Sequence, residues 1–137
     1  MNMTVEIAIV PCLSDNYAYL VKRGQACAVV DPSEAAPVTA ALKARGWQLT
    51  HILNTHHHLD HTGGNLALKQ ATGASVVGPG KDAARIPGID VGVSEASGWE
   101  FASLAVQVLE VPAHTRGAIT FVIDGNAFTG DTLFAMG

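Results

Sequence analysis

The segment Asn54-Thr55-His56-His57-His58-Leu59-Asp60-His61-Thr62-Gly63-Gly64 decides the fold and the chemistry that this sequence predicts. It holds four of the six histidines of the chain. Its H-x-H-x-D-H pattern combines imidazole with carboxylate, the side chains that a divalent cation such as zinc prefers when thiolates are absent. The alternative is a histidine-rich surface turn, but a strand-like run precedes the segment and a glycine pair ends it. We therefore expect a built metal site.

The spacing within the segment indicates how the ligands are shared. Alternate side chains of extended backbone lie on one face, so His56 and His58 can approach one cation together. Asp60 and His61 follow where the chain turns toward the next helix, so they can face a second cation beside the first. The glycine pair lets the backbone make that turn without side-chain crowding. His57 points the other way and is expected either to support the ligands without binding the cation or to be structural.

Two downstream residues are expected to complete the site. His114 lies in a loop between two predicted strands, and a catalytic zinc usually has three protein ligands and one water. Asp131 follows an apolar strand, and its two carboxylate oxygens could bridge adjacent cations, although turn-forming or helix-capping aspartates are common. His51, three residues before the end of its predicted strand, is expected to be an ordinary half-buried histidine and not a ligand.

Length and composition limit the classes of protein. The 137 residues, 48% hydrophobic and 15% charged, indicate one folded domain covering residues 1–137. The net charge is −4 and no run of Lys and Arg occurs, so nucleic acid is not an expected partner. The apolar runs are strand-sized and the N-terminus lacks a signal-peptide pattern, which predicts a cytoplasmic protein without membrane contact. Cys12 and Cys27, without C-x-x-C spacing, are expected to be free buried thiols.

The periodicity predicts an α/β or mixed fold in which helices cover a sheet. One helix is expected with Pro37 in its first turn and Gly46 at its end, and another over about Asn65–Thr72, ending at Gly73. Hairpin turns are expected at Arg23-Gly24-Gln25 and Asp124-Gly125-Asn126. The segment Gly78–Gly88 is expected to be mostly loop. The predicted strands are Thr4–Val10, Tyr17–Lys22, Ala26–Asp31, His51–Asn54, Ala74–Val77, Val91–Val93, Trp99–Phe101, Leu104–Val111, Ala118–Ile123 and Ala127–Thr129.

Taken together, these residues resemble the metallo-β-lactamase superfamily, and within it glyoxalase II, the hydroxyacylglutathione hydrolases. The matching pieces are Asp15-Asn16-Tyr17, Val29-Val30-Asp31-Pro32, the Thr55-to-Gly64 cluster, His114-Thr115-x-Gly117 and Phe128-Thr129-Gly130-Asp131-Thr132-Leu133-Phe134. The cluster alone is typical of the superfamily, whereas the first and last pieces favour glyoxalase II. One departure is Ala118, at a position where family members often have histidine.

The resemblance implies an αββα sandwich with two divalent metal ions, most simply zinc, with iron or manganese as alternatives. It assigns His56, His58 and His114 to the first ion, Asp60 and His61 to the second, and Asp131 to a bridge. The nucleophile would be a metal-bound water, and the substrate a small-molecule thioester, S-lactoylglutathione, split into lactate and glutathione. The family also uses a downstream histidine and glutathione-binding basic residues of a C-terminal helical domain.

The chain ends at Phe134-Ala135-Met136-Gly137, directly after an apolar strand and a Gly-Asp turn, which suggests that the fold is incomplete at the C-terminus. Two alternatives to glutathione-thioester hydrolysis stay open. One is another reaction of the same fold, either a different thioesterase or hydrolase or an iron-dependent persulfide dioxygenase. The other is a metal-binding fragment without turnover, which could self-associate through exposed apolar surface.

Overall fold

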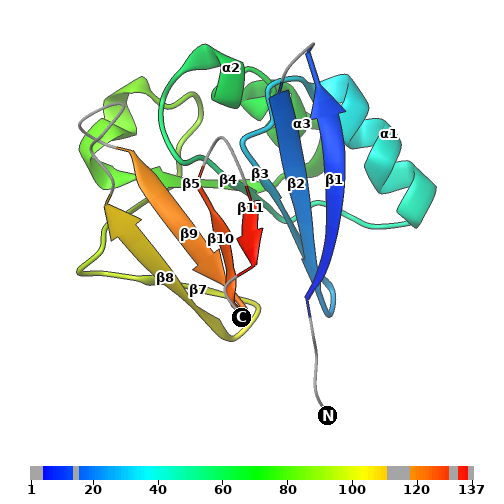
Figure 1. Cartoon of the computed structure of the whole chain (residues 1–137). Helices are drawn as coiled ribbons and strands as arrows, with labels where there is room; N and C mark the ends of the chain where they lie inside the picture. The colour runs from blue at the N-terminus through cyan, green and yellow to red at the C-terminus, as the bar shows by residue number, and fades with distance from the viewer. Residues whose placement is uncertain (1–4, 14–15, 111–117, 130–132, 136–137) are drawn as a thin grey trace.

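Two β-sheets and a set of helices make up this protein, as the computed structural model shows for residues 5–13, 16–110, 118–129 and 133–135 (Figure 1). The elements in chain order are β1 (Glu6–Cys12), β2 (Asn16–Arg23), β3 (Ala26–Val30), α1 (Ala35–Arg45), β4 (His51–Leu53), α2 (Leu59–Thr62), α3 (Asn65–Thr72), β5 (Ser75–Pro79), the 3₁₀ helix η1 (Gly80–Arg85), β6 (Val91–Val93), β7 (Trp99–Phe101), β8 (Leu104–Glu110), β9 (Ile119–Ile123), β10 (Asn126–Phe128) and β11 (Leu133–Ala135).

The first sheet has the order β1-β2-β3-β4-β5-β6. Its first three strands form antiparallel hairpins, whereas β3, β4, β5 and β6 run parallel. Parallel neighbours need a crossover, and α1 and α3 supply it between β3 and β4 and between β4 and β5. The carboxyl ends of β3 and β4 therefore meet at one edge of the sheet, which is where such folds place their ligands.

The second sheet has the order β11-β10-β9-β8-β7 and is antiparallel throughout. The Asp124-Gly125 turn joins β9 to β10, with φ values of 49° and 76° at the two residues. Two successive positive φ angles are the mark of a tight hairpin turn whose twist matches the strands that flank it. In Figure 1 this sheet faces the first one, on the side away from α1.

Alternating side chains of the first sheet divide the core into two layers. On the helix side, Leu20 and Val29 pack with Val38 and Leu42 of α1 and Leu68 of α3. On the other side, strand residues of both sheets form the interior between them, including the fully buried Phe101, Phe121 and Phe128. The central strands β3 and β5 are buried on both faces, which explains their nearly continuous apolar sequence.

The sequence predictions agree with this architecture in most respects. Helix α3 and strands β6 and β7 have the predicted bounds, and Gly46 and Gly73 end their helices with φ of 67° and 75°. The Gly78–Gly88 prediction was wrong in part, because β5 extends to Pro79 and η1 follows it. Helix α2 and strand β11 were not predicted. No helix in the described part of the chain is long and apolar enough to cross a membrane.

Candidate metal centre

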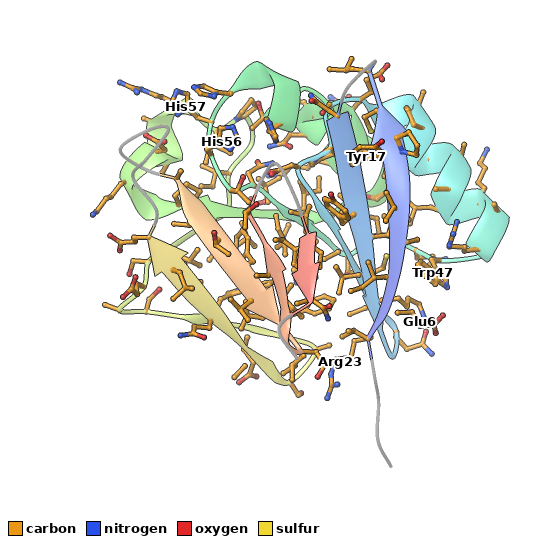
Figure 2. All side chains as sticks on the ribbon, viewed as in Figure 1. Glu6, Tyr17, Arg23, Trp47, His56 and His57 are labelled. Carbon is orange, nitrogen blue, oxygen red and sulfur yellow. The ribbon has the colours of Figure 1, made fainter. Side chains whose placement is uncertain are left out.

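The histidine segment leaves the carboxyl end of β4 and bends into α2. Strand pairing stops at Leu53, so His56 and His58 lie in a bent loop and not on an extended strand as predicted. Their ring centroids nevertheless lie 4.8 Å apart, and the centroid of the His56 ring lies 4.2 Å from that of His61 in α2. Three of the predicted ligand side chains therefore converge. Figure 2 shows His56 and His57 at the α2 end of the molecule, opposite Arg23.

Asp31 also belongs to this cluster, although it is not among the ligands that the sequence predicts. It follows β3 and is 1% exposed, and its backbone N–H donates to the Leu53 carbonyl at 2.8 Å. Its φ of 51° is unusual for a residue with a side chain, although aspartate tolerates it better than most. One ligand atom from each of Asp31, His56 and His61 lies within 4.8 Å of the others.

Hydrogen bonds fix the Asp31 carboxylate against the loop after β4. The Thr55 backbone N–H donates to Oδ1 at 2.8 Å, and the Thr55 hydroxyl donates to Oδ2 at 2.7 Å. The same hydroxyl oxygen lies 2.9 Å from Nδ1 of His56, and Asp31 Oδ2 lies 3.3 Å from Nδ1 of His61. Asp31 and Thr55 thus connect the ends of two parallel strands to two imidazoles.

Polar contacts also hold the remaining parts of the loop. Nδ1 of His57 lies 2.8 Å from Oδ2 of Asp82 in η1, so His57 joins the cluster to its neighbouring helix, in keeping with the structural role expected for it. The buried Asn54 and Asn65 side chains bond to each other, with the Asn65 amide donating to Asn54 Oδ1 at 2.6 Å. The loop between β4 and α3 is therefore held from several sides.

Gly64 permits a close contact beneath the cluster. Its N–H donates to the Pro32 carbonyl at 2.8 Å. A Cβ at this position would lie 2.9 Å from the Pro32 oxygen and 3.0 Å from backbone atoms of Ala35 and Glu34. Glycine is required here because two backbone segments touch, and not because of its φ, which is −89°.

The cluster faces one end of the second sheet. The Ile119 N–H, at the start of β9, donates to the Thr55 carbonyl at 2.8 Å. Because β9 and β10 are antiparallel, with Phe121 opposite Phe128, the carboxyl end of β10 lies at the same end of the sheet. His114 and Asp131 lie outside the described residues, as does the side chain of Asp60, but the chain enters β9 and leaves β10 beside the cluster.

His51 occupies a different environment, as expected. It is half-buried, its ring packs edge-on against Trp99 and Phe101 at 5.4 and 5.5 Å, and its Nδ1 lies 2.8 Å from the Thr50 hydroxyl. Burial lowers the pKa of His51 below its usual value, since it disfavours the charged form. This histidine stabilises the sheet interior and is separate from the cluster.

The described donors suit a divalent cation. Imidazole nitrogen and carboxylate oxygen together are the ligand types of zinc and related ions. His56 and His61 are 9% and 6% exposed, so both rings are held in place and largely shielded from water. His58 is exposed, which leaves one side of the cluster open to solvent.

A family model of the metallo-beta-lactamase superfamily matches residues 13–137 of this chain. The chain belongs to the metallo-beta-lactamase superfamily. Its curated relatives include the hydroxyacylglutathione hydrolase of Methylococcus capsulatus, 51% identical over 97% of this chain and 54% of the relative. The hydroxyacylglutathione hydrolase of Rhodospirillum rubrum is 49% identical over 98% of this chain and 54% of its own length. The chain thus spans about half the length of these curated relatives.

Solved structures of metallo-beta-lactamase proteins share the fold. ETHE1 from Myxococcus xanthus superimposes with a TM-score of 0.74 and 28% identity over 93% of this chain and 56% of that one. BJP-1, a subclass B3 metallo-beta-lactamase of Bradyrhizobium japonicum, gives a TM-score of 0.77 at 21% identity, over 100% of this chain and 61% of that one. The predicted fold class is confirmed, and the described residues make up the first helix layer and the two sheets of the sandwich.

Superfamily membership and the Asp31–His56–His61 group together indicate that this metallo-beta-lactamase protein binds a divalent metal. The sequence did contain a signal for Asp31, which is a charged residue directly after a continuous apolar strand. Such a residue stands at the carboxyl end of a parallel strand, the same edge to which the histidine segment belongs. Its partner Thr55 is 24 positions away, so only the folded structure shows the contact.

Proposed function

We propose that this protein is a metal-dependent hydrolase that cleaves a glutathione thioester, S-lactoylglutathione, into lactate and glutathione. The observation that carries the proposal is the convergence of His56, His58 and His61 at the carboxyl ends of β3 and β4. The support for the substrate is the identity of about half of all positions with proteins named hydroxyacylglutathione hydrolase. We also propose that residues 1–137 belong to a single domain of this fold.

The proposed ligands form a dinuclear centre for two divalent ions, most simply zinc. His56, His58 and His114 would hold the first ion, Asp60 and His61 the second, and Asp131 would bridge the two. The Ile119–Thr55 hydrogen bond supports the inclusion of His114 and Asp131, since it brings the sheet end that flanks both residues to the cluster. Asp31 is not in this set; its oxygens accept hydrogen bonds from the Thr55 N–H and hydroxyl, which suits a role in positioning the imidazoles.

A bound divalent cation would lower the pKa of a coordinated water toward neutrality and polarise the thioester carbonyl. The protein's own residues supply the rigid frame for that chemistry. Asp31 and Thr55 orient the buried imidazoles, and the Asn54–Asn65 pair holds the loop that carries them. The exposed His58 lies on the side from which a substrate would enter. Because a thiolate is a good leaving group, no strong general acid is needed.

Hydrolysis of S-lactoylglutathione by the zinc-loaded protein tests this function. We expect His58→Ala to reduce kcat/KM by more than about 100-fold, since it removes a direct ligand, a larger loss than that of an outer-shell partner. The matched control is His51→Ala, which removes a histidine outside the cluster and should leave kcat/KM within about threefold, because the His51 ring packs against Trp99 and Phe101 and bonds to Thr50. Equal rates for His58→Ala and the unchanged protein would contradict the proposal. Zinc binding without turnover would contradict the hydrolase function and leave the metal site standing.

The location and self-association of the protein are also proposals. We propose a cytoplasmic location, supported by the two free buried thiols Cys12 and Cys27, which suit a reducing compartment. For self-association, the support is β1, an edge strand whose inter-sheet face continues from Ile7 into Ile9. Ile9 and the neighbouring Tyr17 are 58% and 50% exposed, and an edge strand with apolar side chains invites pairing with a second copy.

A further inference from the structure

The Thr55 hydroxyl lies between a buried carboxylate and an imidazole. Its oxygen is 2.7 Å from Asp31 Oδ2 and 2.9 Å from Nδ1 of His56. Thr55 is fully buried and Asp31 is 1% exposed, so water does not compete for these contacts. A hydroxyl has one proton to donate, which means that it can donate to only one of its two neighbours.

The chemistry of the neighbours decides where that proton goes. An ionised carboxylate can only accept, so the Thr55 proton must point to Asp31 Oδ2. The hydroxyl oxygen then offers only lone pairs to His56, and the 2.9 Å contact is a hydrogen bond only if Nδ1 carries a proton. The opposite arrangement would need a protonated Asp31, yet the Thr55 backbone N–H also donates to this carboxylate, at 2.8 Å. Both oxygens of the Asp31 carboxylate thus act as acceptors toward Thr55.

We propose that Thr55 is a positioning residue that relays the Asp31 charge to His56 and fixes its imidazole as the Nδ1–H tautomer. Nε2 then carries the lone pair and is the nitrogen that His56 offers to a cation. The tautomer is a property of the metal-free protein, and only its effect on affinity rests on the proposed metal site. Fixing it removes the need to select one of two tautomers at each binding event and makes Nε2 a stronger ligand.

His58 provides an internal comparison. It belongs to the same loop and is exposed, and among the described residues no hydrogen-bond partner of its ring is found. A neutral imidazole in that setting exchanges between its two tautomers. The relay therefore predicts one tautomer at His56 and a mixture at His58.

Nuclear magnetic resonance of the metal-free protein tests the tautomer directly. Long-range ¹H–¹⁵N correlations at about pH 8, above the usual imidazole pKa of about 6.5, distinguish protonated from unprotonated ring nitrogens. We expect His56 to show a protonated Nδ1 and an unprotonated Nε2, and His58 to show averaged nitrogens. An Nε2–H tautomer at His56 would overturn the proposal without any substitution being needed.

Two variants test the effect on metal binding. Thr55→Val keeps the shape and loses the hydroxyl, whereas Thr55→Ser keeps the hydroxyl. Measured by competition with a chelator, the zinc Kd should rise by about 10- to 100-fold in Thr55→Val and stay within about threefold in Thr55→Ser. Equal Kd values for the two folded variants would overturn the relay. An unchanged protein that binds no zinc would instead overturn the proposed metal site, and the tautomer measurement would still decide the relay.

Discussion

Replacing Gly64 with alanine should destabilise this protein strongly, although alanine is the better helix former. Gly64 precedes α3 at φ −89° and ψ −5°, outside the left-handed region that favours glycine, so its backbone conformation alone does not exclude alanine. The added Cβ, however, would lie 2.9 Å from the Pro32 carbonyl oxygen and 3.0 Å from two further backbone atoms. All three are main-chain atoms, of Pro32, Glu34 and the first residue of α1, so no flexible side chain can move aside.

The size of the effect follows from two contributions. Overfilling a close-packed contact costs about 1–3 kcal/mol. The segments must also separate, which weakens the 2.8 Å hydrogen bond from the Gly64 N–H to the Pro32 carbonyl and costs about 1 kcal/mol more. We therefore expect the free energy of unfolding to fall by about 2–4 kcal/mol. Because Asp31 directly precedes Pro32, the same separation should also weaken metal binding.

Urea unfolding followed by the fluorescence of the two tryptophans, Trp47 and Trp99, measures this loss. The matched control is Gly80→Ala, whose Cβ would meet its nearest neighbour, the Val93 oxygen, at 3.5 Å, an ordinary contact. That control should change the free energy of unfolding by less than about 1 kcal/mol. A free energy of unfolding for Gly64→Ala within about 0.5 kcal/mol of that of the unchanged protein would show that this backbone contact tolerates a Cβ, contrary to the prediction.

Three further predictions concern pH, metal and assembly. Burial raises the pKa of Cys27 from 9.0 to about 11, so between these values only the unfolded chain ionises this thiol. The free energy of unfolding should therefore fall by up to about 1.4 kcal/mol per pH unit between these pKa values, and less steeply in Cys27→Ala. Equal slopes for the two proteins would contradict the raised pKa of Cys27. Zinc at about 100 times its Kd should add about 2.7 kcal/mol to the free energy of unfolding, and a chelator should reverse this gain. A Tm that changes with neither zinc nor chelator would contradict the metal site. In sedimentation, Ile9→Lys should shift the protein from oligomer to monomer. An unaltered distribution of sedimenting species would exclude self-association through β1.

Much of the fold could be predicted because local signals were strong. Gly46 and Gly73 end their helices in the left-handed conformation that favours glycine, and the Asp124-Gly125 pair forms the expected turn. Helix α2 was not predicted because its four residues are too few to show a helical period. Its aspartate and histidine indicated metal ligands and gave no signal of a helix. Strand β11 is only three residues long and pairs with β10, so its register depends on a partner that the local sequence does not show.

The candidate site was predicted in part for the same reason. His56, His58 and His61 are close in sequence, and the structure brings their rings together, although through a bend and not through strand alternation. Asp31 and Thr55 could not be assigned in this way, since their contact joins the ends of β3 and β4. Helix α1 separates these two strands in sequence, and they become neighbours only in the folded protein. Tertiary contacts of this kind determine which ring nitrogen faces a ligand, and no local pattern records them.

We propose that side chains distant in sequence form one dinuclear metal site. Anomalous diffraction at the zinc absorption edge, on crystals of the zinc-loaded protein, tests it most directly. We expect two peaks about 3.5–4 Å apart. Nε2 of His56 should lie about 2.0–2.1 Å from one of them, with His114 and Asp131 also bound. Peaks remote from the His56–His61 loop, or peaks that neither His114 nor Asp131 touches, would contradict it.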